Sequence, residues 1–121
     1  MIIAFTGHRD SGTTKACLDD IAKDAIWIHG GAEGFDSQVE RYAQMYGIKT
    51  KIILPDYERF GKNAPLVRNS AIIASADLLV ACYDGRTYGG TYYTINLAKE
   101  IKISVKYVKC LKLKGLNRDK K

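Results

Sequence analysis

The residues best suited to chemistry are three glycines that follow an apolar run. Residues 28–36 read Ile-His-Gly-Gly-Ala-Glu-Gly-Phe-Asp, and an amphipathic pattern comes after them. This order predicts a strand, a turn with accessible backbone and the start of a helix. Backbone N–H groups and the positive end of the helix dipole would then face an anion. We therefore predict a phosphate-bearing, nucleotide-like ligand here, with a purely structural strand-to-helix turn as the alternative.

The spacing of these glycines excludes two common phosphate-binding motifs. Gly30, Gly31 and Gly34 do not fit G-x-G-x-x-G, and no Gly-Lys-Ser/Thr forms a P-loop. Asp36 has two interpretations, a structural cap of the following helix or an acceptor for a ribose hydroxyl, and we favour the cap.

A second glycine-rich segment, Gly89-Gly90-Thr91, follows the clearest apolar run of the chain and is another candidate phosphate cradle. Its alternative is a flexible loop. Two such segments on one edge of a sheet are more informative than either alone, because both would place backbone N–H groups around the same ligand.

Two arginines lie in segments that are expected near this edge. Arg9 follows the first apolar run, and its planar guanidinium fits phosphate oxygens, although a surface pair with Asp10 is equally consistent. Arg68 falls near the start of a helix after Pro65, so phosphate binding and simple solvation both remain open. The complete set of predicted ligand-binding residues is Gly7, His8, Arg9, Gly30, Gly31, Ala32, Glu33, Gly34, Asp36, Arg68, Asn69, Asp84, Gly89, Gly90 and Thr91.

No pattern in the chain indicates nucleophilic or metal chemistry. There is no nucleophile elbow, no H-E-x-x-H and no Cys-x-x-Cys. We therefore predict no catalytic residue, no metal and no cofactor.

Alternating strands and helices are expected to position these segments. Short apolar runs alternate with helical patterns five times, which predicts an α/β fold with a mostly parallel five-stranded sheet between two helix layers. The simplest strand order is 3-2-1-4-5, as in a Rossmann-like three-layer sandwich, and ligands bind where that order reverses. The expected strands cover residues 2–5, 26–28, 49–54, 78–83 and 103–108. The first expected helix has apolar residues between 16 and 25, and the later ones cover residues 36–46, 65–76 and 91–101. Residues 56–64 are expected to form a polar loop.

Composition indicates one domain of 121 residues with a net charge of +6. Nine of the nineteen Lys and Arg residues lie between 99 and 121, so we divide the chain into a binding domain, 1–109, and a basic C-terminal tail, 110–121, which we expect to be frayed or variable. Three widely spaced cysteines, Cys17, Cys82 and Cys110, are typical of reduced thiols and predict a cytoplasmic protein. No apolar run is long enough to span a membrane.

Several motifs in this order resemble the SLOG superfamily, which joins the Smf/DprA DNA-processing proteins and the LOG phosphoribohydrolases; the YspA-like branch is the most similar. The resemblance runs from residue 3 to about residue 108. The motifs are Gly7-x-Arg9-Asp10, residues 29–36, residues 55–62, Arg68-Asn69 and Gly89-Gly90-Thr91.

The resemblance implies a Rossmann-like fold that binds nucleotides, nucleotide-derived signals such as cyclic ADP-ribose species, or single-stranded DNA. It also implies that the two glycine-rich segments hold phosphate with Arg68 nearby. LOG enzymes use a glutamate where this chain has Thr94, so hydrolysis by that mechanism is not expected unless Glu33 or Asp84 replaces the missing acid.

We therefore expect a protein that binds an ADP-ribose or cyclic ADP-ribose type molecule, as a sensor or as a sponge in phage–host conflict, and that forms a dimer or larger homo-oligomer. Hydrolysis of nucleoside monophosphates is the first alternative. The second is single-stranded DNA binding through the basic residues Lys106, Lys109, Lys112 and Lys114.

Overall fold

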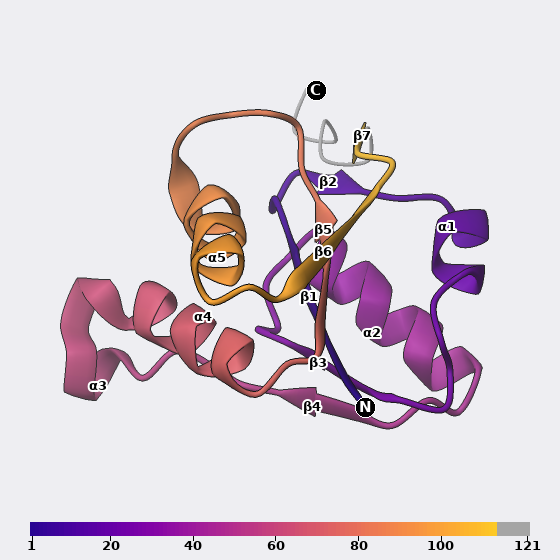
Figure 1. Cartoon of the computed structure of the whole chain (residues 1–121), viewed down its shortest axis with the longest axis horizontal. Helices are drawn as coiled ribbons and strands as arrows, with labels where there is room; N and C mark the ends of the chain where they lie inside the picture. The colour runs from indigo at the N-terminus through magenta and orange to yellow at the C-terminus, as the bar shows by residue number, and fades with distance from the viewer. Residues whose placement is uncertain (114–121) are drawn as a thin grey trace, which may run out of the picture.

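Five parallel strands form the central sheet of the computed structural model, which describes residues 1–113 (Figure 1). Their order is β4-β3-β1-β5-β6, so the predicted order 3-2-1-4-5 is confirmed. β1 lies at the centre, and its register pairs Ala4 with Ile28 on one side and with Leu79 on the other. The strands are β1 (Ile2–Gly7), β3 (Ile26–His29), β4 (Thr50–Ile52), β5 (Leu78–Cys82) and β6 (Ser104–Val108).

Helices cover both faces of this sheet. α1 (Lys15–Asp19) and α2 (Phe35–Met45) lie on one face, while α4 (Ala64–Ala74) and α5 (Gly89–Glu100) lie on the other (Figure 1). Alternate residues of β1 reach the two layers, because successive side chains of a strand point to opposite faces. Ile3 and Phe5 join the core under α2, and Ala4 joins the core under α4 and α5. The predicted three-layer α/β architecture is therefore confirmed.

The helices that border the functional edge begin and end where local chemistry requires. α4 has Pro65 in its first turn, where the missing N–H costs no helical hydrogen bond. α2 ends before Gly47, which adopts a φ of 67° that favours glycine. α5 begins at Gly89 instead of Thr91, so both glycines of its predicted loop belong to its first turn.

Two segments differ from the predicted elements. Residues 56–64 are not a loop, because Asp56 accepts a hydrogen bond from the N–H of Arg59 (3.1 Å) and caps the short helix α3 (Tyr57–Phe60). A 3₁₀ turn, η1 (Gly61–Asn63), then leads directly into α4. α1 is much shorter than expected and ends at Asp19, although Ile21 is still buried.

The predicted basic tail begins with ordered structure. β7 (Leu111–Lys112) pairs antiparallel with β2 (Ser11–Gly12), in the loop that follows β1. Lys112 Nζ lies 2.9 Å from Asp10 Oδ2, and this ion pair binds the segment to the same loop. Residues 111–112 of the basic tail therefore form a strand, while 114–121 lie outside the described residues. No helix within residues 1–113 has the length and apolar character needed to cross a membrane.

Candidate functional site

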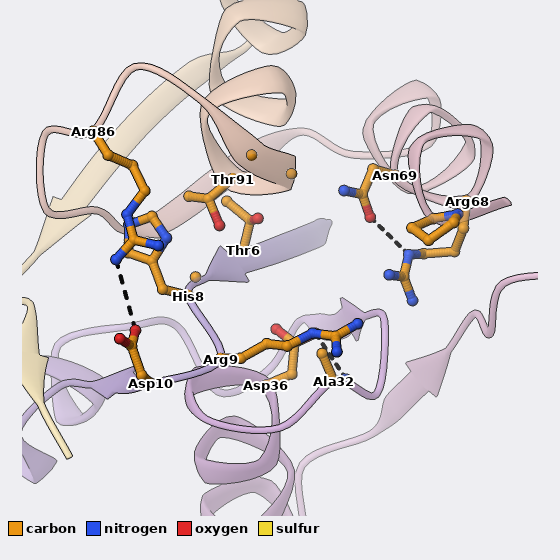
Figure 2. Close-up of a pocket in the computed structure, with 14 residues that line it drawn as sticks. Thr6, His8, Arg9, Asp10, Ala32, Asp36, Arg68, Asn69, Arg86 and Thr91 are labelled. Atoms are coloured by element: carbon orange, nitrogen blue, oxygen red, sulfur yellow. Dashed lines mark hydrogen bonds and ion pairs between the residues drawn. The ribbon is translucent and has the colours of Figure 1, made fainter. Parts of the chain in front are cut away.

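A cavity of about 500 Å³ opens at the carboxyl ends of β1 and β5, where the strand order reverses (Figure 2). This is the edge at which open α/β sheets bind ligands. Most of the predicted ligand-binding residues line it, namely Gly7, His8, Arg9, Ala32, Asp36, Arg68, Asn69, Gly89, Gly90 and Thr91. The structure adds Thr6, Asp10, Pro65 and Arg86 to this lining. The predicted residues outside the lining are Gly30, Gly31, Glu33, Gly34 and Asp84.

The first turn of α5 opens into the cavity. Tyr88 occupies the N-cap position, but neither its side chain nor any other within residues 1–113 caps the turn. A Cβ built on Gly89 would meet nothing within 4 Å, and one built on Gly90 would lie 3.4 Å from Asn69 Nδ2. The backbone is thus accessible at the positive end of a helix dipole, which is an arrangement that attracts anions.

In the loop after β3, by contrast, backbone N–H groups are hydrogen-bonded to nearby side chains. The N–H groups of Gly30 and Ala32 both donate to Asp36 Oδ2 at 3.2 Å, and the Gly31 N–H donates to His29 Nδ1 at 3.0 Å. Gly34 packs against main-chain carbonyls of the loop after β1 and has a φ of 77°. The N–H groups of Gly30 and Gly31 therefore already have partners, and Gly34 holds this loop close to the loop after β1.

Asp36 is the most unusual polar residue of the cavity. The N-cap position of α2 is Gly34, so Asp36 does not cap that position and instead binds the N–H groups of the preceding loop. Its side chain points into the cavity (Figure 2) and is 7% exposed, and Oδ1 has no hydrogen-bond partner within the described chain. Burial raises the pKa of this carboxyl above its ordinary value, because ionisation is disfavoured away from water.

Arg68 connects the two walls of the site. Its Nη1 donates to the carbonyl of Gly30 at 2.6 Å and to that of Ile53 at 3.3 Å, and its Nε donates to Asn69 Oδ1 at 2.7 Å. These bonds hold the guanidinium at the cavity and orient the Asn69 amide. Burial lowers the pKa of Arg68, but an arginine stays charged at any physiological pH.

Arg9 and Arg86 differ in how their charge is used. Arg86 makes a forked pair with Asp84, with Nη2–Oδ2 at 2.5 Å and Nε–Oδ1 at 3.0 Å, and also lies 3.7 Å from Asp10. These contacts hold the pKa of Asp84 well below its usual range and neutralise most of the Arg86 charge. Arg9 is exposed and has no hydrogen bond or ion pair to any residue from 1 to 113, so its charge is available to a ligand.

His8 joins the loops after β1 and β5. Its Nε2 accepts the N–H of Asp84 at 3.2 Å. Burial, and then the nearby charge of Arg86, lower the pKa of His8, so the ring is neutral at pH 7. The short approach to the Asp84 carboxylate, 3.1 Å from Nε2, is therefore no ion pair. His8 therefore serves to position the loops after β1 and β5.

Three residues bear on the expectation about hydrolysis, namely Thr94, Glu33 and Asp84. Thr94 is 2% exposed, and its Oγ1 donates to the carbonyl of Gly90 at 2.8 Å. Glu33 is exposed outside the cavity lining, and Asp84 is occupied by Arg86. Residues 1–113 also contain no cluster of acids, histidines and cysteines that could hold a metal.

The predicted set of ligand-binding residues lacks Thr6, Asp10, Pro65 and Arg86. Arg86 had a usable signal, because it lies in the loop after the fourth predicted strand, between Asp84 and the second glycine pair. Thr6 had none beyond its place at a strand end.

Comparisons with known proteins give no relative: no family model, no curated protein and no solved structure matches the chain. The fold and the cavity are therefore the basis for a functional proposal, together with the motif resemblance.

Proposed function

We propose that the protein binds a nucleotide-derived small molecule of the ADP-ribose or cyclic ADP-ribose type, with a phosphate at the start of α5. One observation carries this proposal: the uncapped first turn of α5 opens into a cavity that also receives Arg9 and Arg68. A helix N-terminus supplies oriented N–H donors, and a guanidinium supplies a charged fork for phosphate oxygens.

The size and chemistry of the cavity support the same ligand class. A volume of about 500 Å³ lies within the usual range for small-molecule sites. The lining is rich in hydroxyl, amide and guanidinium groups, as Thr6, Asn69, Thr91 and the arginines illustrate. Such a lining suits a polar, anionic ligand with several hydroxyl groups better than an apolar one.

Binding without hydrolysis is supported by the residue at the position where LOG enzymes carry their glutamate. The position of the LOG glutamate carries Thr94, whose hydroxyl is bonded to its own helix. A protein that holds a nucleotide signal intact acts as a sensor or as a sponge, and we place this chain in that class.

Exposed apolar side chains near the site support assembly into a homo-oligomer. Leu54, Tyr57 and Leu66 are 67%, 55% and 37% exposed, and they follow β4 or lie on α3 and α4. Burying such side chains between copies would remove apolar surface from water.

The direct test is mass spectrometry of the small molecules that co-purify with the protein. The released molecules, and nucleoside monophosphates or ADP-ribose derivatives incubated with the protein, are separated by chromatography after denaturation. Recovery of an intact nucleotide-type ligand supports the proposal. Release of free base from the added nucleotides would support the hydrolase alternative and contradict simple sequestration.

A matched pair of arginine variants tests the placement of the phosphate. Arg9→Gln removes an unpaired cation at the cavity, and Arg59→Gln removes an exposed cation on α3. We expect the first variant to weaken nucleotide binding by about tenfold, as for a lost hydrogen bond to a charged group, with an unchanged melting temperature. The Arg59 variant is expected to bind as the wild type does. Equal affinities in both variants would contradict this placement.

A further inference from the structure

A buried carboxylate oxygen without a partner lies in the wall of the cavity. Asp36 Oδ2 is fully engaged by the N–H groups of Gly30 and Ala32, whereas Oδ1 is buried and has no hydrogen-bond partner in the described chain. Native proteins rarely leave a buried polar atom unpaired, because the lost hydration is not compensated. Oδ1 therefore needs a partner that residues 1–113 do not supply.

We infer that Asp36 Oδ1 binds a ribose hydroxyl of the ligand, so that the site selects ribonucleotides over nucleotides without free ribose hydroxyls. This inference rests on the proposed nucleotide site and adds the sugar to it. The geometry agrees, because Asp36 lies across the cavity from Thr91 at the start of α5, where the phosphate is proposed (Figure 2). A ribose attached to that phosphate would lie between the two walls.

The chemistry of Oδ1 favours a hydroxyl over a phosphate. An ionised carboxylate accepts hydrogen bonds and repels phosphate, while a protonated carboxyl donates one. A hydroxyl group can donate to the first form and accept from the second. It therefore satisfies Oδ1 whichever form burial favours.

The Arg9 side chain can move to let a ligand reach Asp36. Its side chain lies on the same side of the cavity as Asp36 and Ala32 (Figure 2), yet it is bonded to no residue in the described chain. Arg68 stays in place through its bonds to Gly30 and Ile53. An incoming sugar could therefore displace the Arg9 side chain without breaking a hydrogen bond.

The test compares ligands on the wild-type protein by calorimetric titration. The probes are ADP-ribose, the four ribonucleoside 5′-monophosphates, their 2′-deoxy and 2′,3′-dideoxy counterparts, and pyrophosphate. We expect the dideoxy compounds to bind about 10- to 100-fold more weakly than the ribonucleotides, the effect of one lost hydrogen bond to a charged group. Equal affinities for the two sets would overturn the inference and leave the nucleotide site intact. No binding of any probe, pyrophosphate included, would overturn both.

Two variants assign the selectivity to Asp36. Asp36→Asn keeps an oxygen for the N–H groups of Gly30 and Ala32 and turns an uncharged amide towards the cavity. Because charge-assisted hydrogen bonds are roughly twice as strong as neutral ones, we expect the ribo-to-dideoxy affinity ratio to fall at least about fivefold. Asp24→Asn makes the same change at an exposed turn and is expected to keep the wild-type ratio. An unchanged ribo-to-dideoxy ratio in the Asp36 variant would show that another group binds the hydroxyl, and would overturn the assignment to Asp36.

Discussion

The two glycine-rich segments look alike in the sequence and do opposite things in the fold. In the loop after β3, the N–H groups of Gly30, Gly31 and Ala32 are all bonded to nearby side chains. At the start of α5, Gly89 and Gly90 lie open at an uncapped helix end. The first segment is a scaffold that shapes the cavity, and the second is an open backbone surface that faces it.

The difference shows that glycine content alone does not identify an anion site. What distinguishes the two segments is whether a side chain accepts from the backbone. Asp36, placed shortly after the first glycines, occupies the N–H groups that a phosphate would need. No residue in the described part of the chain does the same at Gly89, so variants at the two segments should separate stability from binding.

Replacement of Gly34 by alanine should have the largest effect and should act on stability. The new Cβ would lie 2.5 Å from the carbonyl oxygen of His8, at a φ of 77°. Overpacking against main chain and the left-handed backbone together predict a loss of about 3 kcal/mol or more in the free energy of unfolding. Gly89→Ala shares a positive φ but meets open space, so about 1–2 kcal/mol is expected. Urea unfolding of both variants measures the two losses in the free energy of unfolding. Equal losses would contradict the expected difference between the two segments.

Replacement of Gly90 by aspartate should break binding and spare the fold. Gly90 has no positive φ, and an acid in the first turn of a helix interacts favourably with the dipole. We expect unchanged or slightly higher stability, with nucleotide affinity reduced about tenfold or more by repulsion of the phosphate. Gly90→Asn, similar in shape and uncharged, separates charge from bulk. Calorimetric titration gives the affinities, and wild-type affinity in the aspartate variant would place the phosphate elsewhere.

Replacement of Gly31 by alanine should weaken the fold moderately and leave the ligand site intact. Its Cβ would lie 2.9 Å from a methyl group of Ile52 at a φ of 72°, and that side chain can move. A loss of about 1–2 kcal/mol is therefore expected from the backbone conformation. Gly31 lies outside the cavity lining, so nucleotide affinity should match the wild type. A large loss of affinity without a loss of stability would indicate that the loop after β3 contacts the ligand.

The smallest effect should be a pH dependence that reports on Asp36. Its folded pKa is raised by burial, so the folded carboxyl binds a proton more tightly than the unfolded one. Wild-type stability should therefore increase relative to Asp36→Asn as the pH falls through the folded pKa, and the gain should be complete near the unfolded value of 3.8. Paired urea titrations of the two proteins between pH 8 and pH 4 measure this change. A constant difference over this range would contradict a raised pKa.

The strand order could be predicted from the sequence because each strand is apolar and each connection is helical. That pattern leaves few topologies, and it places the loops after β1 and β5 at one edge. Individual hydrogen bonds around the site could not be predicted in the same way. Neither the bond of Arg68 to Gly30 nor the capture of loop N–H groups by Asp36 has a signature in spacing, because both depend on how α4 and α2 pack. The capped turn at Asp56 had a local signature that the polar composition obscured.

The short β2–β7 pair makes the rim of the binding edge locally less stable than the central sheet. Two-residue strands contribute few hydrogen bonds, and this pair joins segments that are very far apart in the chain, so closing it carries a large entropy cost. Such a pair opens at a much lower free energy than the central sheet. Amide hydrogens of residues 11–12 and 111–112 should therefore exchange with deuterium well before those of β1 and β5. The rim that carries Asp10 and Lys112 would then loosen and re-form many times for each complete unfolding of the protein.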